Sequence, residues 1–242
     1  MANVDLVIPC YNEEHVLAGS VERLIAWTVE HPEHEWRIVV ANNASTDRTF
    51  EVAKDLEARY PCVSAMQIRV KGRGIALRTA WLTSDADVMA YMDVDLSTDI
   101  DHIPELVDPI VRGDADLTYG TRLHSLSRTN RSTKREITSR GYVAILRLAG
   151  LKVSDAQCGF KAISREAARA LVPLVKDTQW FWDSELLFLA QENGYRMAEV
   201  PVRWVEDPDT RVKIVKTASE DLRGIWRLKR HGIPKVVRPS GR

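Results

Sequence analysis

The sequence contains no apolar run that approaches the roughly 20 residues needed for a membrane-spanning helix. The best candidate, residues 142–151, is short and includes Arg147. Charges of the two signs also balance, with 34 Lys and Arg against 34 Asp and Glu, so no overall field draws the protein to a polyanion. We therefore expect a protein that is soluble or lies on a surface, and any attraction to nucleic acid or lipid has to come from a local patch.

Cysteine is scarce, and the three that occur, Cys10, Cys62 and Cys158, include no Cys-x-x-Cys pair. Such a set is typical of reduced cysteines in a cytosolic protein and not of a disulfide framework or a zinc site. The chain also lacks internal repeats and the Gly-x-Gly-x-x-Gly pattern of dinucleotide-binding folds. Strand-forming residues begin almost at the first position, so no signal peptide is expected.

What is present is the composition of an ordinary globular protein, 45% apolar and 28% charged, in 242 residues. Apolar runs typical of buried strands alternate with helical patterns through the first half. The predicted strands cover residues 4–8, 38–41, 63–70, 88–92 and 115–120, and the helices that follow them begin near residues 13, 47, 75 and 103. This alternation predicts an α/β fold with a mostly parallel central sheet flanked by helices.

The second half is less regular. It contains a basic loop at 122–133, helices near 137–148 and 182–192, strands near 159–163 and 197–204, and a basic helix from about Lys216. We predict one main domain, residues 1–215, followed by a basic amphipathic helix and tail, residues 216–242.

Polar clusters follow four of the predicted strands, and ligands of open parallel sheets bind beyond the carboxyl ends of the strands. The clusters are residues 9–13, 42–47, 93–95 and 120–122. Asp93 and Asp95 form the strongest pair, because side chains at i and i+2 of an extended backbone point the same way and two carboxylates suit Mg²⁺ or Mn²⁺. An isolated Asp-x-Asp is also common in solvated turns, but its place directly after a buried strand favours the metal.

Two other clusters offer groups for a nucleotide. Tyr11 presents a ring for base stacking and Asn43 an amide that can bind a base edge, although Asn12 and Asn43 are equally compatible with a helix N-cap and a turn. Residues 71–74, Lys-Gly-Arg-Gly, precede a helix and could present amide groups and cations to phosphate.

Six motifs occur in an informative order: Pro-Cys-Tyr-Asn-Glu at 9–13, Asn-Ala-Ser-Thr-Asp at 43–47, Lys-Gly-Arg-Gly at 71–74, Asp-Val-Asp-Leu-Ser at 93–97, Gly-Thr-Arg at 120–122, and Asp-Ala-Gln-Cys-Gly-Phe-Lys at 155–161. Together they resemble the polyprenyl-phosphate sugar synthases, inverting family 2 glycosyltransferases with a GT-A fold, such as dolichyl-phosphate mannose and glucose synthases. The resemblance runs from about residue 4 to residue 215. The last motif and residues 180–186 are more like the glucosyl branch.

The resemblance implies a site on both sides of a transferred sugar. On the donor side, it implies nucleotide-sugar binding by Pro9, Tyr11, Glu13, Asn43, Asp93, Val94, Asp95 and Arg211, with Asp93 and Asp95 also holding the metal. On the acceptor side, it implies that Arg122 lies between the donor and acceptor phosphates and that Arg135 and Ser139 hold the acceptor phosphate. Asp93, Asp95 and Arg122 would then be the catalytic residues.

Two departures from the family pattern bear on the donor and the metal. Asn42 and Asn43 stand where the family usually has Asp, which leaves the choice between a UDP-sugar and GDP-mannose open. Ser97 stands where mannose synthases can have a metal-binding Gln, which leaves the third protein ligand open. The expected acceptor, a lipid monophosphate, is ionised near neutral pH, with a second pKa of about 6, so it needs no general base.

Basic residues gather in two stretches, six Lys and Arg at 122–140 and eight at 216–242. In the second stretch, an apolar stripe is flanked by arginines: Ala218, Leu222, Ile225 and Trp226 beside Arg223, Arg227 and Arg230. This pattern is typical of a helix on an anionic membrane, and equally of a core-facing helix with a solvated basic side. We expect peripheral association with the cytoplasmic membrane face, leave a membrane-protein partner open, and expect no nucleic acid because no nucleic-acid module accompanies the charge.

Three alternatives stay open at this point. One is a family 2 transferase that acts on a sugar or protein hydroxyl. Another is a sugar nucleotidyltransferase-like enzyme, although such enzymes carry a glycine-rich, arginine-bearing loop in place of Pro-Cys-Tyr-Asn-Glu. The third is a nucleotide-binding module without turnover.

Overall fold

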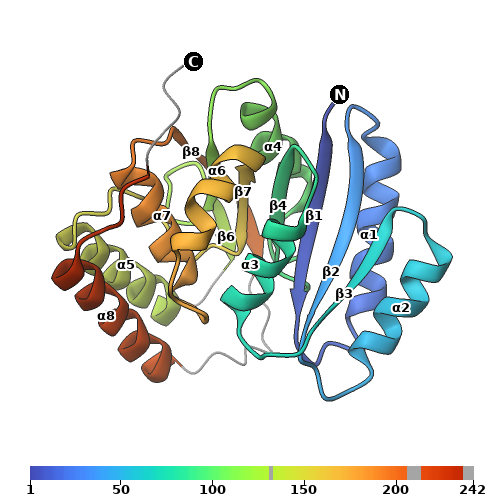
Figure 1. Cartoon of the computed structure of the whole chain (residues 1–242), viewed down its shortest axis with the longest axis horizontal. Helices are drawn as coiled ribbons and strands as arrows, with labels where there is room; N and C mark the ends of the chain where they lie inside the picture. The colour runs from blue at the N-terminus through green and yellow to red at the C-terminus, as the bar shows by residue number, and fades with distance from the viewer. Residues whose placement is uncertain (131–132, 206–213, 237–242) are drawn as a thin grey trace.

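The computed structural model describes residues 1–130, 133–205 and 214–236, with side chains from residue 136 in the second range and from residue 219 in the third. Its centre is a seven-stranded sheet in the order β3-β2-β1-β4-β7-β5-β8 (Figure 1). The strands are β1 (Asn3–Cys10), β2 (Glu35–Asn43), β3 (Val63–Ile68), β4 (Val88–Met92), β5 (Leu117–Thr121), β7 (Phe160–Ser164) and β8 (Met197–Pro201). Only β7 runs antiparallel to its neighbours, so the predicted α/β class with a mostly parallel sheet is confirmed.

Helices cover both faces of this sheet (Figure 1). One face carries α1 (Leu17–Glu30), α2 (Thr49–Arg59) and α4 (Ile103–Val111), the last preceded by the 3-10 turn η1 (Ile100–His102). The other face carries α3 (Arg73–Thr83), α6 (Arg165–Leu171), the 3-10 turn η2 (Val172–Leu174) and α7 (Trp182–Glu192). Two further helices, α5 (Thr133–Leu148) and α8 (Ile214–His231), lie on the α7 side of the molecule.

Alternation within the strands supplies the two cores. In β1, Leu6 and Ile8 pack under α1, α2 and α4, whereas Val7 packs with α3 and α7 on the other face. Strands buried on both faces are apolar throughout, which is why runs such as Val88–Met92 are continuous and not alternating. The two faces hold separate apolar clusters, so the sheet is the middle layer of three.

Some element boundaries differ from the prediction, chiefly at the edge where the strands end. The helix expected from Glu13 begins at Leu17, because Asn12 has a positive φ of 57° and the chain forms a loop first. Asn42 and Asn43, predicted to follow the strand at 38–41, are the last residues of β2. Helix α5 begins at Thr133, four residues before the predicted start.

The strand predicted at residues 197–204 is two strands. β8 ends at Pro201, and β9 (Arg203–Val205) pairs instead with β6 (Arg128–Asn130) in a small second sheet, within the predicted basic loop. Val202 makes the bend: its N–H donates to the carbonyl of Thr121 (3.1 Å), and its carbonyl accepts from the N–H of Arg128 (3.1 Å). Helix α6 was also not predicted.

Helix α8 has one buried and one exposed side. Leu228 belongs to the core beneath α7 and Asp221 is buried, while Leu222 and Trp226 are 52% and 58% exposed. The helix therefore packs on the core by one face, and its use of the exposed face for membrane binding stays a prediction. No helix in the described part of the chain is long and apolar enough to span a bilayer. The division of the chain between residues 215 and 216 stays a prediction.

Candidate functional site

The sheet topology brings the predicted site segments to one edge. From β1 the chain moves to β2 and β3 on one side, and β4 lies on the other side, so the connections diverge between β1 and β4. Val7 pairs with Tyr91 in parallel register, which places the ends of β1 and β4 side by side. Because β7 is antiparallel, the loop that precedes it, residues 155–159, reaches this same edge. A switch point of this kind is where open α/β sheets bind ligands.

Among the described residues, three that are not glycine adopt the left-handed backbone region, and each follows a strand that ends at this edge. Asn12 (φ 57°) follows β1, Ala44 (φ 57°) follows β2 and Leu96 (φ 50°) follows β4. Such backbone costs about 1–3 kcal/mol per residue and is concentrated at functional sites. Its restriction to adjacent loops marks this edge as the functional one.

The loops after β1 and β2 are joined by hydrogen bonds. The Asn12 N–H donates to Ser45 Oγ (3.0 Å), and the Thr46 N–H donates to Asn12 Oδ1 (2.8 Å). The Glu13 N–H donates to Thr49 Oγ1 (2.8 Å). Asn12 thus connects two loops and does not cap α1, whose N-cap is Val16. Pro9, at the end of β1, and Tyr11 and Glu13, in its loop, are held in this rigid arrangement.

Two predicted nucleoside ligands contact the Lys-Gly-Arg-Gly segment. Asn43 is buried, and its Oδ1 accepts a hydrogen bond from the Gly72 N–H (2.8 Å). Lys71 Nζ lies 3.5 Å from the centre of the Tyr11 ring, a cation–π contact. A base that stacks on this face of Tyr11 has to displace the Lys71 ammonium group.

Asp93 and Asp95 occupy a turn and not the extended backbone assumed from the sequence. The Leu96 N–H donates to the Asp93 carbonyl (3.2 Å), and the Ser97 N–H donates to Asp95 Oδ1 (3.0 Å). Both aspartates are nevertheless exposed, while Val94 between them is buried. The two carboxylates are therefore accessible at this edge, although the backbone between them is a turn and not a strand.

Arg73 connects Asp93 to a buried charge network. Its Nη2 donates to Asp93 Oδ1 (3.1 Å), and its Nη1 pairs with Asp183 of α7. Asp183 also accepts from the Tyr91 hydroxyl and pairs with the fully buried Lys161 Nζ (3.0 Å). Burial alone would raise the pKa of Asp183, but Lys161 and Arg73 outweigh it and lower that pKa. Buried charges persist when they are paired in this way.

Sequence reasoning assigned no role to Lys161 or Asp183. A signal was available for Lys161, a charged residue in the largely apolar segment Phe160–Ser164, but not for Asp183, because the helix Trp182–Glu192 carries other charged residues. Such residues are almost never fully buried unless they are paired. The identity of the partner could not be read from the pattern.

Arg122, predicted to lie between two phosphates, is held by Asp155. Its Nε and Nη2 donate to the two carboxylate oxygens (2.7 and 3.1 Å), and its backbone N–H donates as well (3.2 Å). The Trp204 ring of β9 lies against the guanidinium, 5.5 Å from centre to Cζ. Burial would raise the pKa of Asp155, but the positive charge of Arg122 lowers it. Asp155 and Trp204 were not predicted as site residues.

The Asp155–Lys161 motif packs directly on the aspartate turn. Gly159 is so close to Asp93 that a side chain at this position would collide with the carboxylate. Cys158 is fully buried, which raises the pKa of its thiol to about 12 and makes it an inert core residue. The motif thus brings Arg122 and Asp93 into one site.

Besides Arg122, the predicted residues of the acceptor side lie on α5. Arg135 and Ser139 are one turn apart in this helix and therefore on the same face of it. Ser139 is partly exposed, and the side chain of Arg135 lies outside the described residues. Arg211 also lies outside them.

The donor set at the turn suits a hard divalent cation. Carboxylate oxygens are preferred by Mg²⁺ and Mn²⁺, and Mg²⁺ is usually held by one or two carboxylates together with substrate phosphate and water. Asp93 and Asp95 provide two such groups, and within the described ranges no cluster of three or more His, Cys, Asp or Glu is present. The residues present therefore fit an ion that takes much of its shell from a diphosphate.

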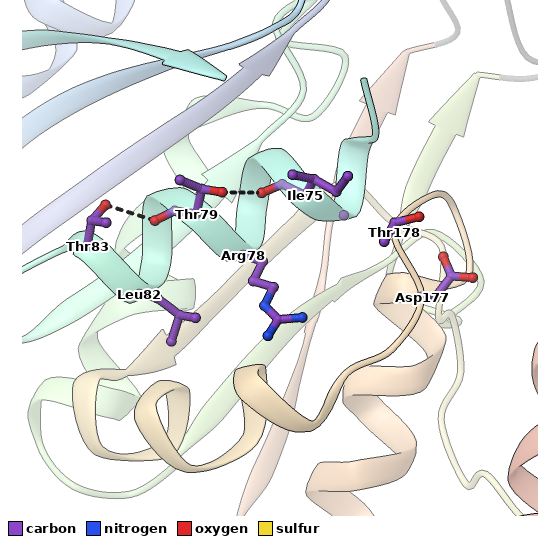
Figure 2. Close-up of a pocket in the computed structure, with 8 residues that line it drawn as sticks. Ile75, Arg78, Thr79, Leu82, Thr83, Asp177 and Thr178 are labelled. Carbon is purple, nitrogen blue, oxygen red and sulfur yellow. Dashed lines mark hydrogen bonds between the residues drawn. The ribbon is translucent and has the colours of Figure 1, made fainter. Parts of the chain in front are cut away.

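A separate groove lies along α3 (Figure 2). It has a volume of about 430 Å³ and is lined by Gly74, Ile75, Arg78, Thr79, Leu82 and Thr83 on one side and by Asp177 and Thr178 on the other. The hydroxyls of Thr79 and Thr83 donate to their own helix (2.8 Å each). Of these residues only Gly74 belongs to a predicted motif, the Lys-Gly-Arg-Gly segment, and the other predicted donor residues do not line this groove.

Comparisons with known proteins identify the family and the fold. The family described as "Glycosyl transferase family 2" matches residues 5–172. Glycosyltransferase AglD of Haloferax volcanii is 37% identical over 233 residues, which cover 93% of this chain and 37% of that protein. Dolichyl-phosphate beta-glucosyltransferase ALG5C of Trichomonas vaginalis is 31% identical over 246 residues, which cover 92% of this chain and 73% of that protein.

The fold has solved counterparts. Glucosyl-3-phosphoglycerate synthase from Mycobacterium tuberculosis, in complex with Mn²⁺, UDP and phosphoglyceric acid, superposes with a TM-score of 0.66. The identity is 22%, and the match covers 96% of this chain and 80% of that chain. This likeness confirms the predicted GT-A architecture.

Proposed function

Because this chain belongs to glycosyl transferase family 2, we propose that it moves a hexose, with glucose from UDP-glucose as the first candidate, to a polyprenyl phosphate. Its membership of the family, predicted from six motifs, is confirmed, and the chain is a glycosyltransferase. It spans 37% of the haloarchaeal relative and 73% of the trichomonad one, so the substrates of the whole relatives are proposals here. Several relatives are named dolichyl-phosphate beta-glucosyltransferases, which favours UDP-glucose over GDP-mannose.

One observation favours a phosphate over a hydroxyl as the acceptor group. Asp155 and Asp183 are buried carboxylates in ion pairs with Arg122 and Arg73, and these pairs lower the pKa of each. A carboxylate of lowered pKa is a poor proton acceptor, whereas an acceptor hydroxyl needs a base. A phosphate is already ionised near neutral pH and needs none.

The donor diphosphate is proposed to lie over the aspartate turn. Asp93 and Asp95 would hold Mg²⁺ or Mn²⁺, which neutralises charge on the leaving diphosphate. Pro9, Tyr11, Glu13 and Asn43 would bind the nucleoside, and Val94 and Arg211 would complete the donor site. These roles rest on position at the strand ends and on the family motifs.

Arg122 is proposed to face both phosphates. Asp155 and the Trp204 ring fix its guanidinium, so its charge is in place before substrate arrives. An acceptor phosphate oxygen then bonds to the anomeric carbon as the bond from that carbon to the nucleoside diphosphate breaks, which inverts the configuration. Arg135 and Ser139 would hold the attacking phosphate from α5.

A lipid acceptor requires access to a membrane, and two helices supply a suitable surface. Leu222 and Trp226 of α8 are exposed, as are Ile137 (67%) and Leu148 (88%) of α5. Basic residues accompany them on both helices. Apolar side chains with flanking Lys and Arg favour peripheral binding to an anionic, cytoplasmic membrane face.

A parallel acceptor assay tests the proposal. Radiolabelled UDP-glucose and GDP-mannose, each with Mn²⁺ or Mg²⁺, are offered with polyprenyl phosphate, unphosphorylated polyprenol, phosphoglyceric acid and a soluble saccharide. We expect label from UDP-glucose in the polyprenyl phosphate fraction, with an alkali-stable, inverted linkage shown by NMR. Label only in the saccharide or in phosphoglyceric acid would refute the lipid acceptor and leave the family assignment intact.

A further inference from the structure

Helix α8 is fastened to the body by residues that occupy one face. Asp221 is 1% exposed, and Leu228 is buried in the core beneath α7. Between them, Gly224 crosses Phe181 so closely that a methyl group at residue 224 would lie 2.2 Å from a ring carbon. Arg227 pairs with Glu185 of α7 (2.6 Å). The position of α8 on the body is therefore closely specified.

Asp221 makes one contact that the packing of the helix does not require. Its Oδ2 accepts a hydrogen bond from Gln157 Nε2 (3.1 Å), across 64 residues of sequence. Its Oδ1 is buried and has no hydrogen-bond partner among the described residues. The Tyr142 hydroxyl of α5, which shares a hydrogen bond with Ser184 Oγ (2.9 Å), lies next to the same carboxylate.

A buried carboxylate with an unsatisfied oxygen weakens a fold. Burial of a polar group without a partner is unfavourable, and such groups in proteins call for a specific explanation. Leu228, Gly224 and Arg227 already hold α8 against α7. Asp221 instead contacts the Tyr142 hydroxyl of α5 and Gln157, and Gln157 leads to the proposed reaction centre.

Gln157 belongs to the loop that holds Arg122. Its own N–H donates to Asp155 Oδ1 (3.0 Å), and the same carboxylate accepts from the Arg122 guanidinium. Two residues further on, Gly159 lies against Asp93. The contact from α8 is therefore continuous with both sides of the proposed reaction centre.

We propose that Asp221 is a positioning residue, which fixes residues 155–159 through Gln157 and thereby holds Arg122 in its reactive orientation. The consequence for catalysis rests on the proposed function of Arg122, but the structural link does not. Because the opposite face of α8 carries the exposed Leu222 and Trp226, any surface that binds this face acts on the same helix that sets the loop.

The test compares four variants of the full chain: Asp221→Ala, Gln157→Ala, the double variant, and Asp221→Asn, which keeps an oxygen acceptor for Gln157. Asp55→Ala serves as a matched control, because Asp55 is an exposed aspartate on α2, across the sheet. Melting temperature establishes that each variant is folded. Hydrogen–deuterium exchange of residues 155–160 and the NMR signal of the Arg122 Nε–H report the loop and the ion pair directly.

We expect faster exchange at residues 155–160 and a shifted, weakened Arg122 Nε–H signal in Asp221→Ala and Gln157→Ala. We also expect turnover reduced by about tenfold to a hundredfold, with the KM of the nucleotide sugar unchanged. The double variant should be no worse than the more affected single variant. Asp221→Asn and Asp55→Ala should resemble the unmodified protein in exchange at residues 155–160, in the Arg122 signal and in turnover.

Unchanged exchange and an unchanged Arg122 signal in folded Asp221→Ala or Gln157→Ala would overturn the inference, as would losses that multiply in the double variant. If Asp221→Ala does not fold, Gln157→Ala removes the same contact from the other side. If the unmodified protein transfers no sugar to polyprenyl phosphate, only the proposed function is refuted. Hydrogen–deuterium exchange and NMR still test the link from Asp221 through Gln157 to Arg122.

Discussion

Gly159 and Asp93 are in direct contact: a methyl group at residue 159 would lie 1.9 Å from Asp93 Oδ2. Real side chains do not approach an oxygen so closely, so the carboxylate can occupy its position only because residue 159 has no side chain. The two residues come from different motifs, Asp93 directly after β4 and Gly159 directly before β7, which runs antiparallel to β4. Their contact makes the metal-binding turn and the Asp155–Lys161 motif one unit.

We predict that Gly159→Ala reduces turnover by about a hundredfold, because the added methyl group displaces the Asp93 carboxylate. The control is Gly19→Ala on α1, where no atom lies within 4 Å of the added carbon and the helix should gain about 0.5–1 kcal/mol. Steady-state kinetics with saturating nucleotide sugar and Mn²⁺ measure turnover, and thermal shift checks that both variants are folded. Equal turnover in Gly159→Ala and Gly19→Ala would contradict the prediction.

Replacement of either aspartate of the turn should abolish metal-dependent transfer. Asp93→Asn or Asp95→Asn keeps the size of the side chain but removes a negative charge, and we expect turnover to fall by at least about a hundredfold, or roughly 3 kcal/mol of transition-state stabilisation. Circular dichroism checks the fold. Near-normal activity of the unmodified protein in EDTA would show that no metal is required.

Asn43→Asp is expected to alter the relative affinity for UDP and GDP. The amide can donate and accept, whereas a carboxylate only accepts. The bond from the Gly72 N–H to Oδ1 survives the exchange, so the 71–74 segment should stay in place. Isothermal titration with both nucleotides measures the preference, and an unchanged ratio would mean that this side chain does not contact the base.

Arg135→Ala should raise the acceptor KM by about tenfold or more, the effect of losing one charge-assisted hydrogen bond, and leave nucleotide-sugar binding unchanged. Arg140→Ala is the matched control, because Arg140 lies on the same helix, is exposed and pairs with Glu136. Steady-state kinetics with polyprenyl phosphate measure the acceptor KM of both variants. An equal change in both variants would point to a general charge effect.

Asp221→Asn should be more stable than the unmodified protein at pH 8, and the difference should vanish near pH 4. Burial, together with the neighbouring Asp177, Glu220 and Asp183, raises the pKa of Asp221 from 3.8 to about 7. The folded state thus binds this proton more tightly than the unfolded chain, so its contribution to stability declines as pH rises between these two values.

Urea unfolding at pH 4, 6 and 8 measures this dependence. A gain of at least about 1 kcal/mol at pH 8 is expected, since one pKa unit corresponds to about 1.4 kcal/mol. A gain that is the same at all three pH values would show that Asp221 does not titrate in this range.

The sequence was sufficient where a pattern has a local cause. The bounds of β4 and α7 agree with the prediction at both ends, because apolar runs and helical spacing are properties of neighbouring residues. The placement of Asp93, Asn43 and Arg122 at one edge followed from the rule for parallel strands.

The remaining features depend on residues distant in the chain. The spacing of apolar residues does not indicate the direction of a strand in the sheet. The antiparallel orientation of β7, and with it the role of residues 155–159, could therefore not be predicted. The Arg73–Asp183 pair joins residues 110 positions apart. The turn at Asp93–Leu96 requires a left-handed leucine, which propensity alone disfavours.

The antiparallel β7 also has a practical meaning for protein engineering. Because β7 is the one antiparallel strand of the seven-stranded sheet, the helix-to-strand connections that precede the parallel strands lie at the end of the sheet away from the site. Among them are the exposed turns at Gly113 and Gly194. Both glycines have positive φ, and the space beside each is open. Fluorescent labels, affinity handles or a new pair of chain ends can therefore be introduced at these turns. The length of the strands then separates the insertion from the reacting groups.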